Sequence, residues 1–135
     1  MRKISISLFS LSVGFILSFP SILYADAGKV WVPFICENGI TVEGQSVYVV
    51  GNTDSLVNWT VANAIPLSNQ SGKIYPTWSG AIEVPRGQSI EWKCIIRQEK
   101  CPAPCDNDAA TWQPGDNNQF DAPLKGCADA QTCSF

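Results

Sequence analysis

The sequence contains no histidine, only one methionine and few basic residues. Without histidine the chain cannot build a histidine-based catalytic triad, a histidine metal site or an imidazole pH switch. Nine lysine and arginine residues against twelve acidic ones give a net charge of −3. This balance argues against a nucleic-acid binder, which needs a basic face to neutralise phosphate. The 135 residues are enough for one domain and not comfortably for two.

The first 27 residues predict a secretory signal peptide rather than part of the fold. Arg2 and Lys3 are followed by a mostly apolar stretch from Ile4 to Leu23 and by a small-residue cleavage site, Ala25-Asp26-Ala27. An uncleaved membrane anchor is the alternative. Cleavage after Ala27 would leave a mature domain, Gly28–Phe135, which is expected to be secreted or periplasmic, soluble and free-standing. The six cysteines suit such an oxidising compartment.

Apolar residues of the mature chain alternate with a period of two, which is typical of β-strands. Alternation covers 30–36 and 90–96, and short apolar runs at 47–50 and 81–84 are followed by turn signals. No window has a helical stripe, and the tail after residue 121 has no clear period. The pattern predicts an all-β fold, a β-sandwich or an open-sided barrel. The alternating apolar residues are Val30, Val32, Phe34, Cys36, Ile90, Trp92, Cys94 and Ile96.

The same alternation bears on the cysteines. Cys36 and Cys94 lie on the inward-facing side of their strands, so a disulfide between them would cross the core and contribute about 2–4 kcal/mol. For the other four the preferred interpretation is two local pairs, Cys101–Cys105 and Cys127–Cys133. Crossed pairs remain open, because sequence does not fix connectivity. A four-cysteine zinc site is a further alternative, disfavoured by its spacings, so no metal is expected.

Five tryptophans are the most unusual feature of the composition. Trp92 lies on the buried side of its strand and is predicted in the core, whereas Trp31 faces outward and could cover a sheet edge. Trp59, Trp78 and Trp112 lie in or next to polar turns. A large aromatic side chain in a turn is left exposed unless it meets a ligand or a neighbour. Position alone therefore leaves binding and packing equally open for these three.

A sugar is the ligand that suits such residues. One face of a glucose ring is a patch of C–H groups that can lie on an indole, and its hydroxyls need donors and acceptors such as Lys, Asn and Gln. Each stack should contribute about 1 kcal/mol, which leads to roughly micromolar to millimolar affinity. Indoles tilted toward each other would suit a curved α-1,4-glucan, and a coplanar row would suit flat cellulose.

Six blocks, in order, resemble the starch-binding domain of carbohydrate-binding module family 20, and most of all the C-terminal module of bacterial maltotetraose-forming amylases. The resemblance covers about Val30 to Phe120 and implies an antiparallel, immunoglobulin-like sandwich of about seven strands. Cysteines at the positions of Cys36 and Cys94 also occur in those amylase modules. The blocks are Val47-Tyr48-Val49-Val50-Gly51-Asn52, Leu56-x-Asn58-Trp59, Ala64-Ile65-x-Leu67, Tyr75-Pro76-Thr77-Trp78, Ile90-Glu91-Trp92-Lys93-Cys94-Ile95-Ile96-Arg97 and Trp112-Gln113-x-Gly115-x-Asn117.

The resemblance implies two glucan sites. In the first, the family's stacking pair matches Trp59 and Trp112, and its hydroxyl-binding groups match Lys93, Gln113 and Asn117. In the second, aromatic positions match Tyr75 and Trp78, while a further family tyrosine has its place near Glu43.

Three departures from the family pattern affect the first site. Gln113 stands where many members have glutamate, which removes a charge but keeps an acceptor. Val57 stands where the family usually has glycine, and a β-branched residue disfavours the positive φ of such a turn. The loop from Cys101 to Cys105 is extra, and we expect it to form one wall of this site.

These residues indicate a binding protein and not an enzyme. A glycoside hydrolase needs two carboxylates across a cleft, and the acidic residues here are scattered without a catalytic motif. The expected partners are starch, glycogen or maltooligosaccharides, with a separate amylase as a further partner; neither a cofactor nor oligomerisation is expected. The rival interpretation is a secreted cysteine-rich module that binds a protein, as an inhibitor or effector.

Overall fold

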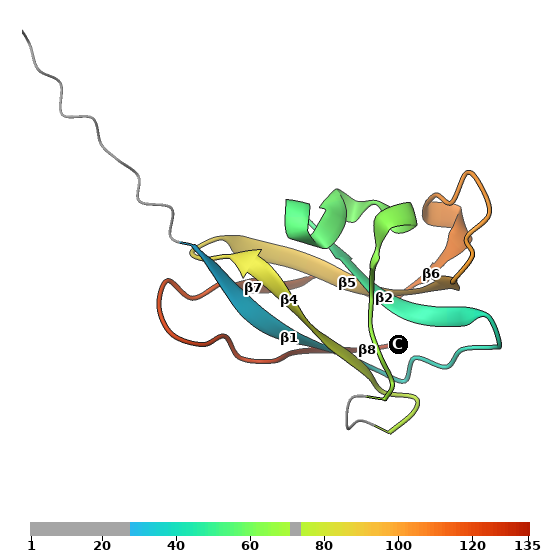
Figure 1. Cartoon of the computed structure of the whole chain (residues 1–135), viewed down its shortest axis with the longest axis horizontal. Helices are drawn as coiled ribbons and strands as arrows, with labels where there is room; N and C mark the ends of the chain where they lie inside the picture. Colours follow the sequence, from blue (N-terminus) through green and yellow to red (C-terminus); the bar gives the residue numbers. More distant parts are fainter. Residues whose placement is uncertain (1–27, 71–73) are drawn as a thin grey trace, which may run out of the picture.

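The computed structural model describes residues 28–70 and 74–135, so the predicted signal peptide lies outside the described residues. Within these ranges, eight strands are linked by three short 3-10 helices, none long and apolar enough to cross a membrane (Figure 1). The elements are β1 (Lys29–Glu37), β2 (Gln45–Gly51), η1 (Asp54–Trp59), η2 (Val61–Asn63), β3 (Ile65–Pro66), β4 (Trp78–Pro85), β5 (Ser89–Gln98), η3 (Asn107–Ala109), β6 (Ala110–Trp112), β7 (Asn118–Asp121) and β8 (Gln131–Ser134).

The strands form two sheets, which confirms the predicted β-sandwich. One sheet has the order β4-β1-β8, and the other has the order β3-β2-β5-β6, with β7 also pairing with β5. All pairs are antiparallel except β1 with β8, which run parallel. The long central strands β1 and β5 therefore belong to different sheets and face each other across the core.

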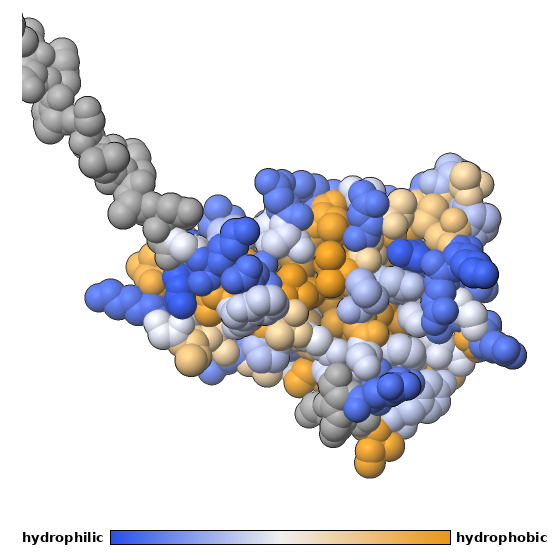
Figure 2. Space-filling model, in the orientation of Figure 1, coloured by the Kyte–Doolittle hydropathy of each residue, from blue (hydrophilic) through white to orange (hydrophobic). Residues whose placement is uncertain are grey.

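The main core lies between the two sheets and follows the predicted alternation. Phe34 on β1 and Trp92 on β5 are almost fully buried and meet edge to face, with ring centroids 4.9 Å apart. Phe120 on β7 packs against the same Phe34 ring at 6.1 Å. Edge-to-face contact between large rings adds to the hydrophobic gain of burial. On the face seen in Figure 2, apolar residues show near the middle of the molecule, and hydrophilic residues cover much of the periphery, apart from a small apolar patch at the lower edge.

The five-stranded sheet is covered on its outer face as well. A second cluster of buried residues sits there, and η1 and η2 lie over it, above β2 and β5 in Figure 1. Arg97 on β5 attaches this layer to the sheet. Its guanidinium carbon lies 4.0 Å from the Tyr48 ring centroid, and its Nε donates to the Val61 carbonyl at 3.0 Å. The sheet is therefore buried on both sides at this point. The cluster consists of Tyr48, Val50, Val61, Ala64 and Ile95.

One feature of the three-stranded sheet differs from expectation. The tail after residue 121 contains a strand, β8, whose four residues are too few to show a period in the sequence. Because β8 pairs with residues 34–37 of β1 on the side opposite β4, only this half of β1 lies between two strands. Trp31 lies before this stretch, where the only described partner of β1 is β4, so its 61% exposed side chain lies at a sheet edge, as expected.

The core assignment leads to a paired prediction on one strand. Phe34→Ala should lower the free energy of unfolding by about 3–5 kcal/mol, because it removes a buried ring and leaves a cavity. Trp31→Ala, three residues earlier on the exposed face, should change it by no more than about 0.5 kcal/mol. Urea unfolding of both variants measures the difference, and equal losses would contradict the described core.

Candidate functional site

Trp59 is presented by a tight turn on the outer face of the five-stranded sheet. Three consecutive residues, Val57, Asn58 and Trp59, have left-handed backbone angles, with φ of 60°, 47° and 63°. Valine therefore adopts the conformation that its branched side chain disfavours. Thr53 holds the turn, since its hydroxyl accepts from the Leu56 amide and its carbonyl accepts from the Asn58 amide. Strain held by surrounding bonds in this way is common at binding sites.

Trp112 ends β6 and lies half-buried against the same hydrophobic cluster as Trp59. Its indole Nε1 donates to the backbone carbonyl of Asn107 at 3.0 Å, which fixes the orientation of the ring. Asn107 opens η3, and this helical turn is capped by the Asp106 carboxylate, which accepts from the Asp108 amide. The orientation of Trp112 therefore depends on the segment that follows the Cys101–Cys105 loop.

Lys93 points from the outer face of β5 toward the turn between β6 and β7. Its Nζ donates to the carbonyls of Gln113 at 2.8 Å and Gly115 at 2.6 Å. An ammonium group has three donors, so one N–H remains without an acceptor among the described residues. Although the side chain is only 8% exposed, it lines a cavity, and the remaining donor is available to a ligand there.

The two predicted amide residues of this turn have different positions. Asn117 is exposed and lines the same cavity, with its Nδ2 3.4 Å from the Glu91 carboxylate. Gln113 is buried, and its amide bonds to the Asn118 side chain and to the Cys94 backbone. The structure therefore places Gln113 beneath the site. Its side chain holds the turn and does not line the cavity.

These residues surround an open cavity of about 370 Å³ on the outer face of the five-stranded sheet. Two half-buried indoles give it apolar surfaces, and an ammonium and amide groups give it hydrogen-bonding capacity. Flat apolar faces beside a few polar groups match a sugar ring, which has C–H patches on its faces and hydroxyls on its edge. The described lining residues are Trp59, Lys93, Asn107, Trp112 and Asn117.

Comparison with known proteins agrees with this geometry. The family model described as "Starch binding domain" matches residues 29–132. The chain belongs to the starch-binding domain family. Its relatives include a glucan 1,4-alpha-maltotetraohydrolase of Roseateles saccharophilus, 47% identical over 100 residues (72% of this chain), and a cyclomaltodextrin glucanotransferase of Klebsiella oxytoca, 40% identical over 91 residues (67% of this chain).

A solved structure extends the agreement to the fold. The family 20 module of a maltotetraose-forming amylase from Pseudomonas saccharophila is 44% identical, with a TM-score of 0.62; the match covers 78% of this chain and all of that one. The predicted family and fold are thus confirmed. The starch-binding domain described here spans only 16% of the Roseateles enzyme and 13% of the Klebsiella enzyme.

The second predicted glucan site is only partly assembled on this starch-binding domain. Tyr75 is 47% exposed, and its hydroxyl lies 3.2 Å from the Thr41 amide. Trp78, by contrast, is 6% exposed, packs in the main core and donates its Nε1 to the Gly39 carbonyl at 2.8 Å. Trp78 nevertheless lines the same open cavity as Tyr75, so the second glucan site stays a prediction. This cavity has a volume of about 560 Å³ and also includes Glu43 in its lining.

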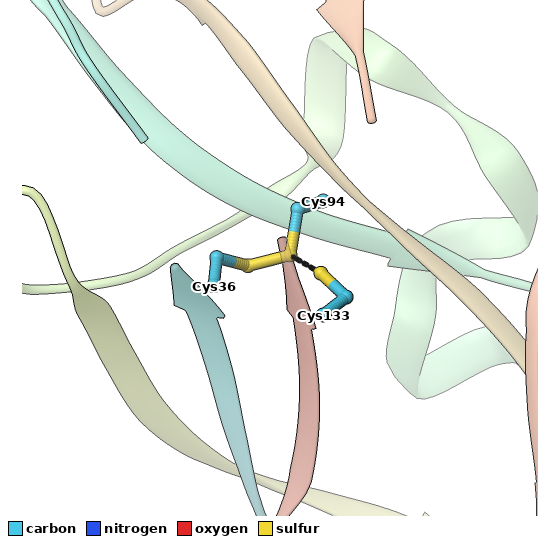
Figure 3. A group of neighbouring side chains, drawn as sticks. All are labelled: Cys36, Cys94 and Cys133. Carbon is cyan, nitrogen blue, oxygen red and sulfur yellow. Dashed lines mark hydrogen bonds between the residues drawn. A yellow bond between two sulfur atoms is a disulfide. The ribbon is translucent and has the colours of Figure 1, made fainter. Parts of the chain in front are cut away.

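The disulfides follow the predicted pattern except at the C-terminus. Cys36–Cys94 and Cys101–Cys105 are both formed, but the preferred pair Cys127–Cys133 is wrong. Pairing of β8 with β1 places Cys133 beside Cys36 inside the core (Figure 3). Cys127, by contrast, is exposed. The Sγ of Cys133 lies 2.6 Å from that of Cys94. Three sulfurs thus gather within 4.8 Å, two of them joined in a disulfide.

The sequence did not predict that Asn107 lines the cavity, and the predicted role of the preceding loop as a wall of the site is wrong. Residues 101–105 do not line the cavity; instead Cys105 packs against the hydrophobic cluster beneath the two indoles, and Asn107 supplies the wall. The only signal in the sequence was an asparagine between two aspartates in a turn, a pattern that is common on any surface.

Lys93 leads to a testable prediction about the structure of the site. Lys93→Met should lower the free energy of unfolding by about 1–3 kcal/mol, because two carbonyls lose their charged donor. Lys100→Met, at an exposed position, is the matched control and should have no effect beyond about 0.5 kcal/mol. Urea unfolding measures both. A Lys93 variant as stable as the control would mean that the ammonium does not hold the turn.

Proposed function

We propose that this starch-binding domain binds starch and related α-1,4-glucans without catalysis, through the cavity between Trp59 and Trp112. The observation that carries the proposal is the presence of two indoles, one buried ammonium with a remaining donor and two exposed amides around one cavity. Similarity to modules of a maltotetraohydrolase and a cyclomaltodextrin glucanotransferase supports the choice of an α-glucan over other sugars.

Binding would combine stacking with hydrogen bonds. The C–H faces of two glucose units would lie on the indoles of Trp59 and Trp112, each contributing about 1 kcal/mol. Lys93 would donate its third N–H to a hydroxyl, and the Asn117 Oδ1 would accept from another. Both indoles are fixed by packing and Trp112 also by its bond to Asn107, so little ordering is required on binding. Roughly micromolar to millimolar affinity follows from so few contacts.

The surroundings of the domain are part of the same proposal. Residues 1–27 would act as a signal peptide, so that the domain reaches the periplasm or the exterior as a monomer. There it would hold starch, glycogen or shorter maltooligosaccharides, and would assist a separate amylase by loosening granules or keeping the polymer close. A role as a protein-binding inhibitor or effector is not favoured, because the exposed chemistry of the site suits a sugar.

Titration of the purified domain with maltoheptaose or β-cyclodextrin tests the proposal. We expect Trp59→Ala and Trp112→Ala each to weaken binding by about five- to tenfold, since each removes one stack, and the double variant to lose retention on insoluble starch. Isothermal calorimetry and granule pull-down are the measurements.

Trp31→Ala is the matched control, because it removes an exposed indole from the other sheet. It should bind like the wild type. If the wild-type domain binds neither ligand, or if the control loses as much affinity as the site variants, the proposed function is wrong.

A further inference from the structure

We propose that Asn107 is an additional hydroxyl-binding residue of the cavity, which the Cys101–Cys105 loop positions there. The inference rests on the proposed function and adds a contact to it. Asn107 lines the cavity together with the two indoles, and its side-chain amide bonds to no residue that the structure describes. An amide offers donors and an acceptor, as a sugar hydroxyl requires.

The other polar groups of the cavity have few free donors and acceptors for a sugar, and Asn107 provides both. Lys93 can only donate, and two of its three donors are used by backbone carbonyls. The Nδ2 of Asn117 lies near the Glu91 carboxylate, so that this amide is partly engaged. A glucan presents pairs of hydroxyls that donate and accept at once. Asn107 is the residue of the lining whose whole amide remains available for such a pair.

The loop fixes where this amide lies. The Cys101–Cys105 disulfide closes a five-residue ring, and Cys105 packs against the hydrophobic cluster under the site. Asp106 then caps η3, whose first residue is Asn107. The Asn107 carbonyl holds the Trp112 indole, so the backbone of this residue is anchored at the cavity rim. A side chain on an anchored backbone loses little entropy when it binds a ligand.

The test is calorimetric titration of Asn107→Ala with maltoheptaose. Alanine removes the amide but keeps the carbonyl that accepts from Trp112, so the indole should stay in place. We expect about three- to tenfold weaker binding, the effect of losing one exposed hydrogen bond. Asp108→Asn is the matched control: it alters the next side chain of η3, which lies outside the cavity lining, and should bind like the wild type.

A panel of monodeoxy maltosides separates contact from mere structural damage. One deoxy position should weaken binding to the wild type but cost nothing further in Asn107→Ala, because the partner of that hydroxyl is already gone. The inference would be overturned if Asn107→Ala bound maltoheptaose as tightly as the wild type does. It would also be overturned if each deoxy position weakened binding to Asn107→Ala as much as it weakens binding to the wild type. Neither result would contradict the proposed function. A wild type that binds no glucan would overturn both.

A second inference comes from the three buried sulfurs in Figure 3. We infer that Cys94 can take either Cys36 or Cys133 as its disulfide partner, so that the bond between the sheets can move from β1 to β8. Cys36 and Cys133 are neighbours in the register of the parallel pair, and both face Cys94 of the opposite sheet. The Cys133 Sγ lies 2.6 Å from the Cys94 Sγ, within reach for attack.

The exchange needs no outside oxidant. The Cys133 thiolate attacks the Cys94 sulfur, the Cys94–Cys133 bond forms, and the Cys36–Cys94 bond breaks. Cys36 leaves as a thiolate and takes up a proton, so the net change is one proton moved from Cys133 to Cys36. Burial raises the pKa of Cys133 to about 12, and nearby Glu37 adds to this, while Lys93 opposes it. Exchange should therefore be slow near neutral pH and faster in alkali.

Tryptic digestion separates the possible pairs. Cleavage gives peptides 30–73 with Cys36, 94–97 with Cys94, and 126–135 with both Cys127 and Cys133. After incubation of the wild type at alkaline pH, followed by acid quenching and thiol blocking, mass spectrometry should find 94–97 joined to 126–135. Cys36→Ser refolded with oxidised glutathione should give the same linked pair.

Stability provides the second readout. Cys36→Ser should keep a urea midpoint near that of the wild type, because β8 replaces β1 as the attachment point, whereas Cys94→Ser should lose the bond in either form and unfold at lower urea. The inference is overturned if 126–135 instead carries an internal Cys127–Cys133 disulfide, or if Cys94 remains a free thiol in the Cys36 variant.

Discussion

The two hydrogen bonds that the Lys93 ammonium donates to backbone carbonyls are the constraint on which the site depends. They join the centre of β5 to the turn after β6, and this turn begins at Trp112 and contains Asn117. A buried cation that donates to carbonyls is costly to displace, because the carbonyls would lose a charged donor. The same side chain thus fixes the shape of the cavity and provides one of its donors.

The fold supports this arrangement by burying one sheet on both faces. On the inner face of β5, Trp92 packs against Phe34 in the aromatic core. On its outer face lies the hydrophobic cluster against which the two site indoles pack. Trp59 and Trp112 are therefore half-buried, with one side held by apolar contacts and the other turned to the cavity. Such preorganisation limits the entropy lost on binding and lets a few modest contacts suffice.

Alternation of apolar residues was enough to predict the sandwich, the inward side of β1 and the Cys36–Cys94 disulfide, because a half-buried strand has a period of two. It could not predict β8, whose four residues pair in parallel with a strand far away in sequence. For the same reason it could not predict that Cys133 lies in the core and is not paired with Cys127. Such placements depend on tertiary contacts, which local pattern does not encode.

Family resemblance pointed to Trp59, Lys93, Trp112 and Asn117, and the structure brings these four to one cavity. For Gln113 and Trp78 the resemblance gave the position but not the direction of the side chain. Gln113 turns inward to the Cys94 amide, and the indole N–H of Trp78 turns inward to the Gly39 carbonyl, although Trp78 also lines the cavity beside Tyr75. The exposure of a residue beside a turn is decided by such bonds, and these cannot be inferred from spacing.

The indole N–H resonances of the five tryptophans, followed by NMR during titration with maltoheptaose, test the central claim most directly. The account predicts that the signals of Trp59 and Trp112 shift together along one saturation curve, while those of Trp31, Trp78 and Trp92 stay in place. Shifts confined to Trp31 or Trp78, or the absence of any change at saturating ligand, would contradict it.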